Sequence, residues 1–176
     1  MAQFLPRDPL LIATTALLWI SFGLLAFAAV VLAFAVPAIL IGATLPIIDI
    51  DSIRPRLIAT DLPLVAALTA AAFVLVSLAL VFIRKLILIV ASVRVSDPLT
   101  DANASRLQTM GWCALAIQFA GVAMKALTLR LPTLIDPAKI ELGFNGSGIL
   151  LILLLFVLAR VFRIGAAMRR DLEGTV

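Results

Sequence analysis

Charged residues divide the chain into long apolar stretches. No charged side chain occurs between Pro9 and Ile48, and further uncharged stretches cover residues 62–83, 107–124 and 142–159. Because a helix rises about 1.5 Å per residue, roughly 20 apolar residues cross a hydrocarbon layer of about 30 Å. The pattern predicts an all-α protein, an integral membrane four-helix bundle. Its spans are expected at about residues 11–36, 62–83, 110–129 and 147–162.

Breakers and capping residues set the expected helix ends. Pro37 is expected to end or kink the first helix, because proline lacks a backbone donor and clashes with the preceding turn. Thr100 is expected to cap the third helix, and Asn145 or Ser147 the fourth. The second and fourth helices are expected to continue past the membrane.

Basic residues predict the orientation of the helices. Nine of the 14 Lys and Arg residues lie in the N-terminal segment, the loop 84–109 and the end of the chain from Arg160 onward, and five lie in the other two loops. The positive-inside rule therefore places both termini, the loop 84–109 and the tail 163–176 in the cytoplasm. Cleavage of a signal peptide after Ala35 is the competing interpretation. The apolar run from Leu10 to Leu32 is longer than the hydrophobic region of such a peptide.

Composition narrows the possible functions. The chain is 64% hydrophobic and contains one cysteine, Cys113, no histidine and no tyrosine. It therefore lacks the commonest transition-metal ligand and the usual near-neutral acid–base group. We expect residues 1–176 to form a single membrane domain with no cofactor, no metal site and no enzymatic activity.

Gln118 is a polar residue near the middle of the third predicted span. An amide in hydrocarbon needs a hydrogen-bond partner, so we expect Gln118 to contact another helix or a second copy of the chain in a homo-oligomer. Interhelical packing is the simpler interpretation, and a place on a conduction or ligand path is the alternative.

Two predicted cytoplasmic segments carry specific motifs. One runs from Ser96 to Trp112 and the other from Ala159 to Val176. Together they resemble the YoaS-like family of small bacterial membrane proteins. The matching positions are Asp97, Pro98, Asn103, Arg106, Leu107, Gly111, Arg160, Phe162, Arg163, Gly165, Asp171, Glu173 and Thr175.

The resemblance has limits and implications. The family usually has Gly where this chain has Ser96, Phe at Leu99 and Glu at Ala102. The resemblance implies a four-span protein of unknown function, often encoded beside a small Cro/CI-type helix-turn-helix regulator. It supplies no activity and no catalytic residues.

Candidate functional residues gather on the predicted cytoplasmic face, where they form either an internal clamp, a surface for anionic lipid headgroups, or a docking site for a cytosolic protein. They are Asp97, Asn103, Arg106, Arg160, Arg163, Arg170, Asp171 and Glu173. The favoured function is a non-enzymatic protein of the bacterial inner membrane that regulates or senses for a helix-turn-helix transcription factor, without binding nucleic acid itself. The alternative is a small channel, carrier or accessory subunit of a larger membrane complex.

Overall fold

The computed structural model describes residues 9–42, 62–95, 99–129 and 145–173. These residues form four α-helices, and all four are long and apolar enough to cross a membrane. The helices are α1 (Pro9–Gly42), α2 (Leu62–Val95), α3 (Asp101–Thr128) and α4 (Gly146–Glu173). The chain is therefore all-α, with the helices of a multi-pass membrane protein.

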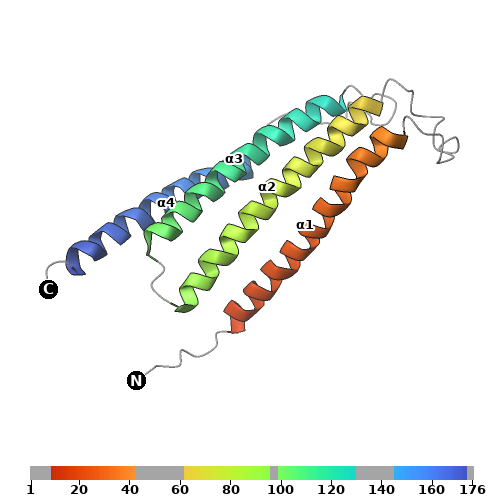
Figure 1. Ribbon diagram of the computed structural model, residues 1–176. Helices are drawn as coiled ribbons and strands as arrows, with labels where there is room; N and C mark the ends of the chain where they lie inside the picture. The colour runs from red at the N-terminus through yellow and green to blue at the C-terminus, as the bar shows by residue number, and fades with distance from the viewer. Residues whose placement is uncertain (1–8, 43–61, 96–98, 130–144, 174–176) are drawn as a thin grey trace.

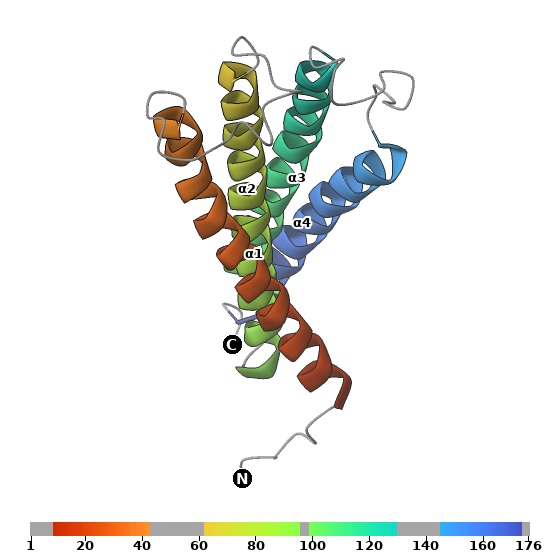
Figure 2. The same ribbon diagram turned by 90° about the vertical axis from the view of Figure 1, so that its right-hand side faces the viewer.

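The helices lie side by side in the order of the chain (Figure 1). α1 packs on α2, α2 on α3, and α3 on α4, while no other pair of described helices packs closely. Figure 2 shows α1 and α4 inclined away from the two middle helices at the upper end. The four helices therefore form an open row and not a closed bundle, because α1 and α4 do not meet.

One end of this row collects the start of α1, the end of α2, the start of α3 and the end of α4 (Figure 1). We call it the Asn103 end, after the residue at its centre. The predicted orientation places the Asn103 end in the cytoplasm.

The predicted caps of α3 and α4 are confirmed. Thr100 has extended backbone angles and its side chain accepts a hydrogen bond from the Asn103 N–H, so it is the N-cap of α3. The side chain of Asn145 accepts a hydrogen bond from the Ser147 N–H at the start of α4. Pro37 does not end α1, which continues to Gly42. Proline removes only one intrahelical hydrogen bond, and the apolar residues after it continue the helix.

The apolar core lies between α3 and α4, with α2 packed against it. Its buried members are Leu107, Met110, Ala114, Ile152, Leu155 and Ala159. Phe82, Leu86 and Ile89 of α2 pack against this cluster. A Cβ added at Gly111 would lie 3.1 Å from the Phe156 ring, so glycine there lets the ring of α4 approach the α3 backbone. The core thus joins three helices and positions the polar groups at the Asn103 end.

Candidate functional site

Asn103 is the centre of a polar network between α2 and α3. Its relative exposure is 0%, and it is the one buried polar residue among those described. The Asn103 Nδ2 group donates to Ser92 Oγ at 2.7 Å, across the interface with α2. Ser92 Oγ in turn donates to the Ile89 carbonyl at 2.6 Å. Since a buried amide is costly without partners, these contacts fix the register of α2 against α3.

Arg106 closes the network on the other side of Asn103. Its Nη1 donates to Asn103 Oδ1 at 2.8 Å and to the Leu88 carbonyl of α2 at 3.0 Å. Hydrogen bonds from an ionised donor are stronger than those between neutral groups. One guanidinium therefore orients the amide of Asn103 and ties α3 directly to the backbone of α2.

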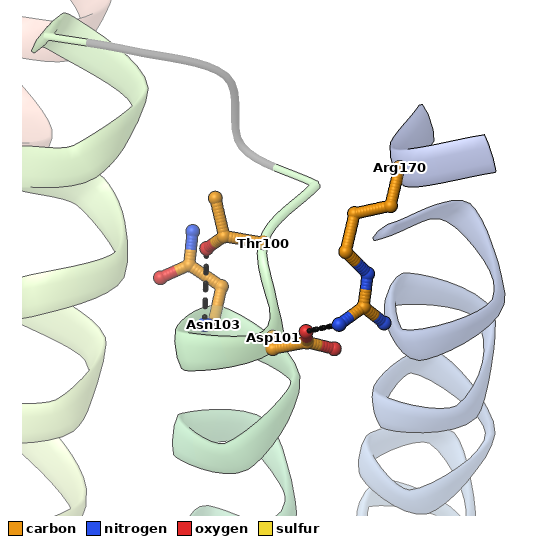
Figure 3. A network of polar contacts seen from close by, with 4 residues as sticks. All are labelled: Thr100, Asp101, Asn103 and Arg170. Carbon is orange, nitrogen blue, oxygen red and sulfur yellow. Dashed lines mark hydrogen bonds and ion pairs between the residues drawn. The ribbon is translucent and has the colours of Figure 1, made fainter. Parts of the chain in front are cut away.

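Two polar contacts tie the end of α4 to α3. Arg170 Nη1 lies 2.9 Å from Asp101 Oδ2 (Figure 3). Arg163 Nη2 donates to Gln108 Oε1 at 2.8 Å. The first contact is an exposed ion pair, so it specifies position more than it stabilises the fold.

Close packing at a glycine adds a third attachment of α4. A Cβ added at Gly165 would lie 3.3 Å from both methyl groups of Leu99, so the residue before the α3 cap packs against the backbone of α4. The Asn103 end is therefore a connected unit made from the ends of three helices.

Gln118 makes a separate contact farther along α3. Its Nε2 donates to the Asn145 carbonyl at 2.8 Å, where α4 begins. A Cβ added at Gly148 would collide with the same amide. Gly148 therefore provides the space in which the Gln118 side chain reaches the first turn of α4.

The contacts between helices also set the levels of the basic residues along the row. Arg106 lies level with Leu88, and Arg163 level with Gln108. With a rise of about 1.5 Å per residue, five basic side chains from three helices fall within about 8 Å along the helix axes. We call them the basic belt: Arg84, Lys85, Arg106, Arg160 and Arg163. Beyond the belt, toward the Asn103 end, α2 and α4 each continue for about ten residues.

The structure assigns different places to the predicted site residues. Asn103 and Arg106 share one network, Arg170 pairs with Asp101, and Arg163 contacts Gln108. Arg160 and Asp171 are exposed on α4. Asp97 lies outside the described residues, and Glu173 ends α4 with a side chain that is also outside them.

Sequence reasoning missed the partners of these residues. Ser92, Gln108 and the Leu88 carbonyl have no distinguishing motif, and their roles follow from how the helices are rotated against one another. In the described part of the chain, no group of three or more His, Cys, Asp or Glu side chains is placed to hold a metal ion. Together, these contacts can fix the positions of the helices and hold charged side chains at the surface.

Comparison with known proteins identifies a family. Neither the curated proteins nor the solved structures include one that matches this chain. A family model described as "Protein of unknown function (DUF2975)" matches residues 36–176. The match contains α2, α3 and α4, with the Asn103 network and the contacts between α3 and α4, and leaves most of α1 outside. The description mentions no helix-turn-helix neighbour, so that part of the resemblance stays a prediction. Since the model covers most of its length, the chain belongs to the DUF2975 family of proteins of unknown function.

Proposed function

We propose that this protein is a non-enzymatic regulator in the bacterial inner membrane that docks a small cytosolic helix-turn-helix transcription factor at its Asn103 end. The observation that carries the proposal is an apolar stripe on α4 that begins at the level of the basic belt and continues toward the Asn103 end. Ile164, Met168 and Leu172 recur every four residues and are 43%, 63% and 71% exposed. Residues four apart lie on one face of a helix, so these side chains form one continuous strip.

With the membrane boundary at the basic belt, Met168 and Leu172 lie in water, and an exposed apolar strip there is typical of a site for a protein partner. Contiguous apolar surface in water is unfavourable, and amphipathic helices use anchors at this spacing to dock on another protein. Arg169, Arg170 and Asp171 flank the strip and supply charges around its rim. A helical regulator with an apolar groove and a mixed-charge rim complements such a surface.

The attachments of α4 give the surface a way to respond to a signal. Contacts at Asp101, Gln108 and Leu99 hold this part of α4 against α3. The Asn103 network holds α3 against α2. A signal in the membrane or the outer loops that shifts α4 against α3 would move the strip and release or retain the regulator. The held regulator stays away from DNA, and the membrane protein itself binds no nucleic acid.

The test uses the helix-turn-helix protein that the family resemblance leads us to expect beside the gene. Detergent-purified full-length protein is expected to capture this regulator, and the double variant Met168→Gln with Leu172→Gln is expected to lose capture at least tenfold. The matched control is Ala91→Gln with Val93→Gln, which alters two exposed positions on the corresponding part of α2. Transcription of the adjacent operon is measured in parallel.

The proposal fails if the wild-type protein does not bind the regulator. It also fails if the Met168 and Leu172 variant folds, inserts and captures the regulator as the wild type does. Equal losses in both double variants would show that capture does not depend on the strip.

A further inference from the structure

One face at the α3–α4 interface combines aromatic and basic side chains, and two contacts between the helices make it continuous. The rings of Trp112 and Phe156 pack edge to face, with centroids 5.4 Å apart. About one turn closer to the Asn103 end, Arg163 hydrogen-bonds to Gln108. Gln108 and Trp112 are four residues apart on α3, and Phe156, Arg160 and Arg163 follow helical spacing on α4. We call this surface the Trp112–Arg163 face.

Among the described residues, no carboxylate balances the charge of this face. Arg163 is exposed, and the partner that holds it, Gln108, is neutral. Arg160 is also exposed, and in the described ranges neither arginine forms an ion pair with a carboxylate. Asp101, the nearby acid at the start of α3, pairs with Arg170 instead. Two guanidinium groups therefore give the face a local positive charge.

The side chains at the level of this face are typical of the boundary between hydrocarbon and water. Arg160 and Arg163 belong to the basic belt, and Trp112 lies within about two turns of both on the apolar side of the belt. Tryptophan is enriched at this boundary because its ring is apolar and its N–H is polar. Trp112 is 57% exposed, so its ring is open to neighbouring lipid. In a bilayer whose boundary lies at the basic belt, the phospholipid phosphates would be at this level.

We propose that the Trp112–Arg163 face is a binding site for the headgroup phosphate of an anionic phospholipid. Guanidinium groups bind phosphate oxygens through paired hydrogen bonds. Gln108 takes one N–H of Arg163 and orients the guanidinium, which leaves its other donors for the ligand. Arg160 supplies the second cation, and Trp112 contacts the glycerol and the upper part of the acyl chains. The aromatic side of the face selects a membrane lipid over a free phosphate ion.

The experiment measures quenching of Trp112 fluorescence by brominated lipids. The Trp19→Phe variant leaves Trp112 as the one tryptophan of the chain. This variant is reconstituted in nanodiscs that contain a small, equal fraction of brominated phosphatidylglycerol or brominated phosphatidylcholine. We expect the anionic lipid to quench Trp112 more strongly. Arg160→Gln and Arg163→Gln should each reduce the relative affinity for it about fivefold, equivalent to about 1 kcal/mol.

Arg84→Gln is the matched control, since it removes a charge of the same belt from α2, outside the face. It should keep the preference for phosphatidylglycerol. Equal quenching by the two lipids, or a preference that survives loss of both Arg160 and Arg163, overturns the proposal. An equal loss of this preference in Arg84→Gln also overturns the proposal, because it would indicate general attraction to the belt. Loss of the preference in excess inorganic phosphate at constant ionic strength overturns it as well, because it would indicate a site for free phosphate. These outcomes concern lipid binding, whereas regulator capture is tested separately at Met168 and Leu172, so the two proposals fail independently.

Discussion

Replacement of Asn103 by alanine should weaken the contact between α2 and α3. The change removes a hydrogen bond to Ser92 and a charge-assisted bond from Arg106. A neutral hydrogen bond contributes about 1 kcal/mol and one to a charged group about 1.5–3 kcal/mol. Arg106 keeps the Leu88 carbonyl and Ser92 keeps the Ile89 carbonyl, so neither is left without a partner. We therefore expect the free energy of unfolding to fall by about 2–4 kcal/mol.

Cys113 provides the assay for this prediction. It is buried and is the one cysteine of the chain, so labelling by a thiol-reactive fluorophore reports unfolding. Wild type, Asn103→Ala, Ser92→Ala and the double variant are unfolded by sodium dodecyl sulfate in mixed micelles. The Ser92–Asn103 pair should show a coupling energy of about 0.5–1.5 kcal/mol. Asn103→Asp should lower the free energy of unfolding less than Asn103→Ala does, because a carboxylate keeps the contact with Arg106.

The control for the Asn103 experiment is Ser105→Ala, at an exposed position two residues along α3. Its free energy of unfolding should stay within about 0.5 kcal/mol of the wild type. The reasoning is refuted if Asn103→Ala is as stable as Ser105→Ala, or if the effects of Ser92→Ala and Asn103→Ala simply add.

Three further predictions concern packing, charge and orientation. Gly148→Ala should break the Gln118 contact with Asn145 and lower the free energy of unfolding by about 1–2 kcal/mol. The control Gly121→Ala should leave it unchanged, because the added Cβ meets nothing within 4 Å. Equal stability of the two variants would contradict the contact. Asp101→Asn should lower the free energy of unfolding by less than about 1 kcal/mol, and added salt should reduce this loss, since the pair with Arg170 is exposed. A large loss that does not depend on salt would contradict this prediction. A topology reporter fused at Val176 should report the cytoplasm, and a periplasmic signal would reverse the predicted orientation.

The sequence alone predicts the helices well, because the bilayer requires long uncharged stretches and those are visible in one dimension. The Thr100 cap was also predictable, since a short polar residue before Asp101 satisfies free N–H groups at a helix start. The end of α1 was not, because Pro37 permits either a kink or a stop and neighbouring residues decide between them.

Contacts between the helices were harder to predict from the sequence than the helices themselves. Asn103 and Gln118 are recognisable as polar residues that need partners, but their partners depend on helix rotation and register. Ser92 and Gly148 resemble many other small residues in the spans until the helices are placed side by side. The sequence also did not predict that the helices form an open row, because the apolar surface of α1 is compatible with either lipid or a protein neighbour.

Photocrosslinking from Met168 in living cells tests the central claim, that the α4 strip docks a helix-turn-helix regulator. A photoreactive amino acid is placed at Met168 or, as the control, at the exposed Ala91 of α2. The account predicts a crosslink between position 168 and the helix-turn-helix regulator that the family resemblance leads us to expect beside the gene, and none from position 91. It predicts that the crosslink weakens when the adjacent operon is induced. The account is contradicted if position 168 gives no crosslink to that regulator while the regulator is present and the membrane protein is inserted.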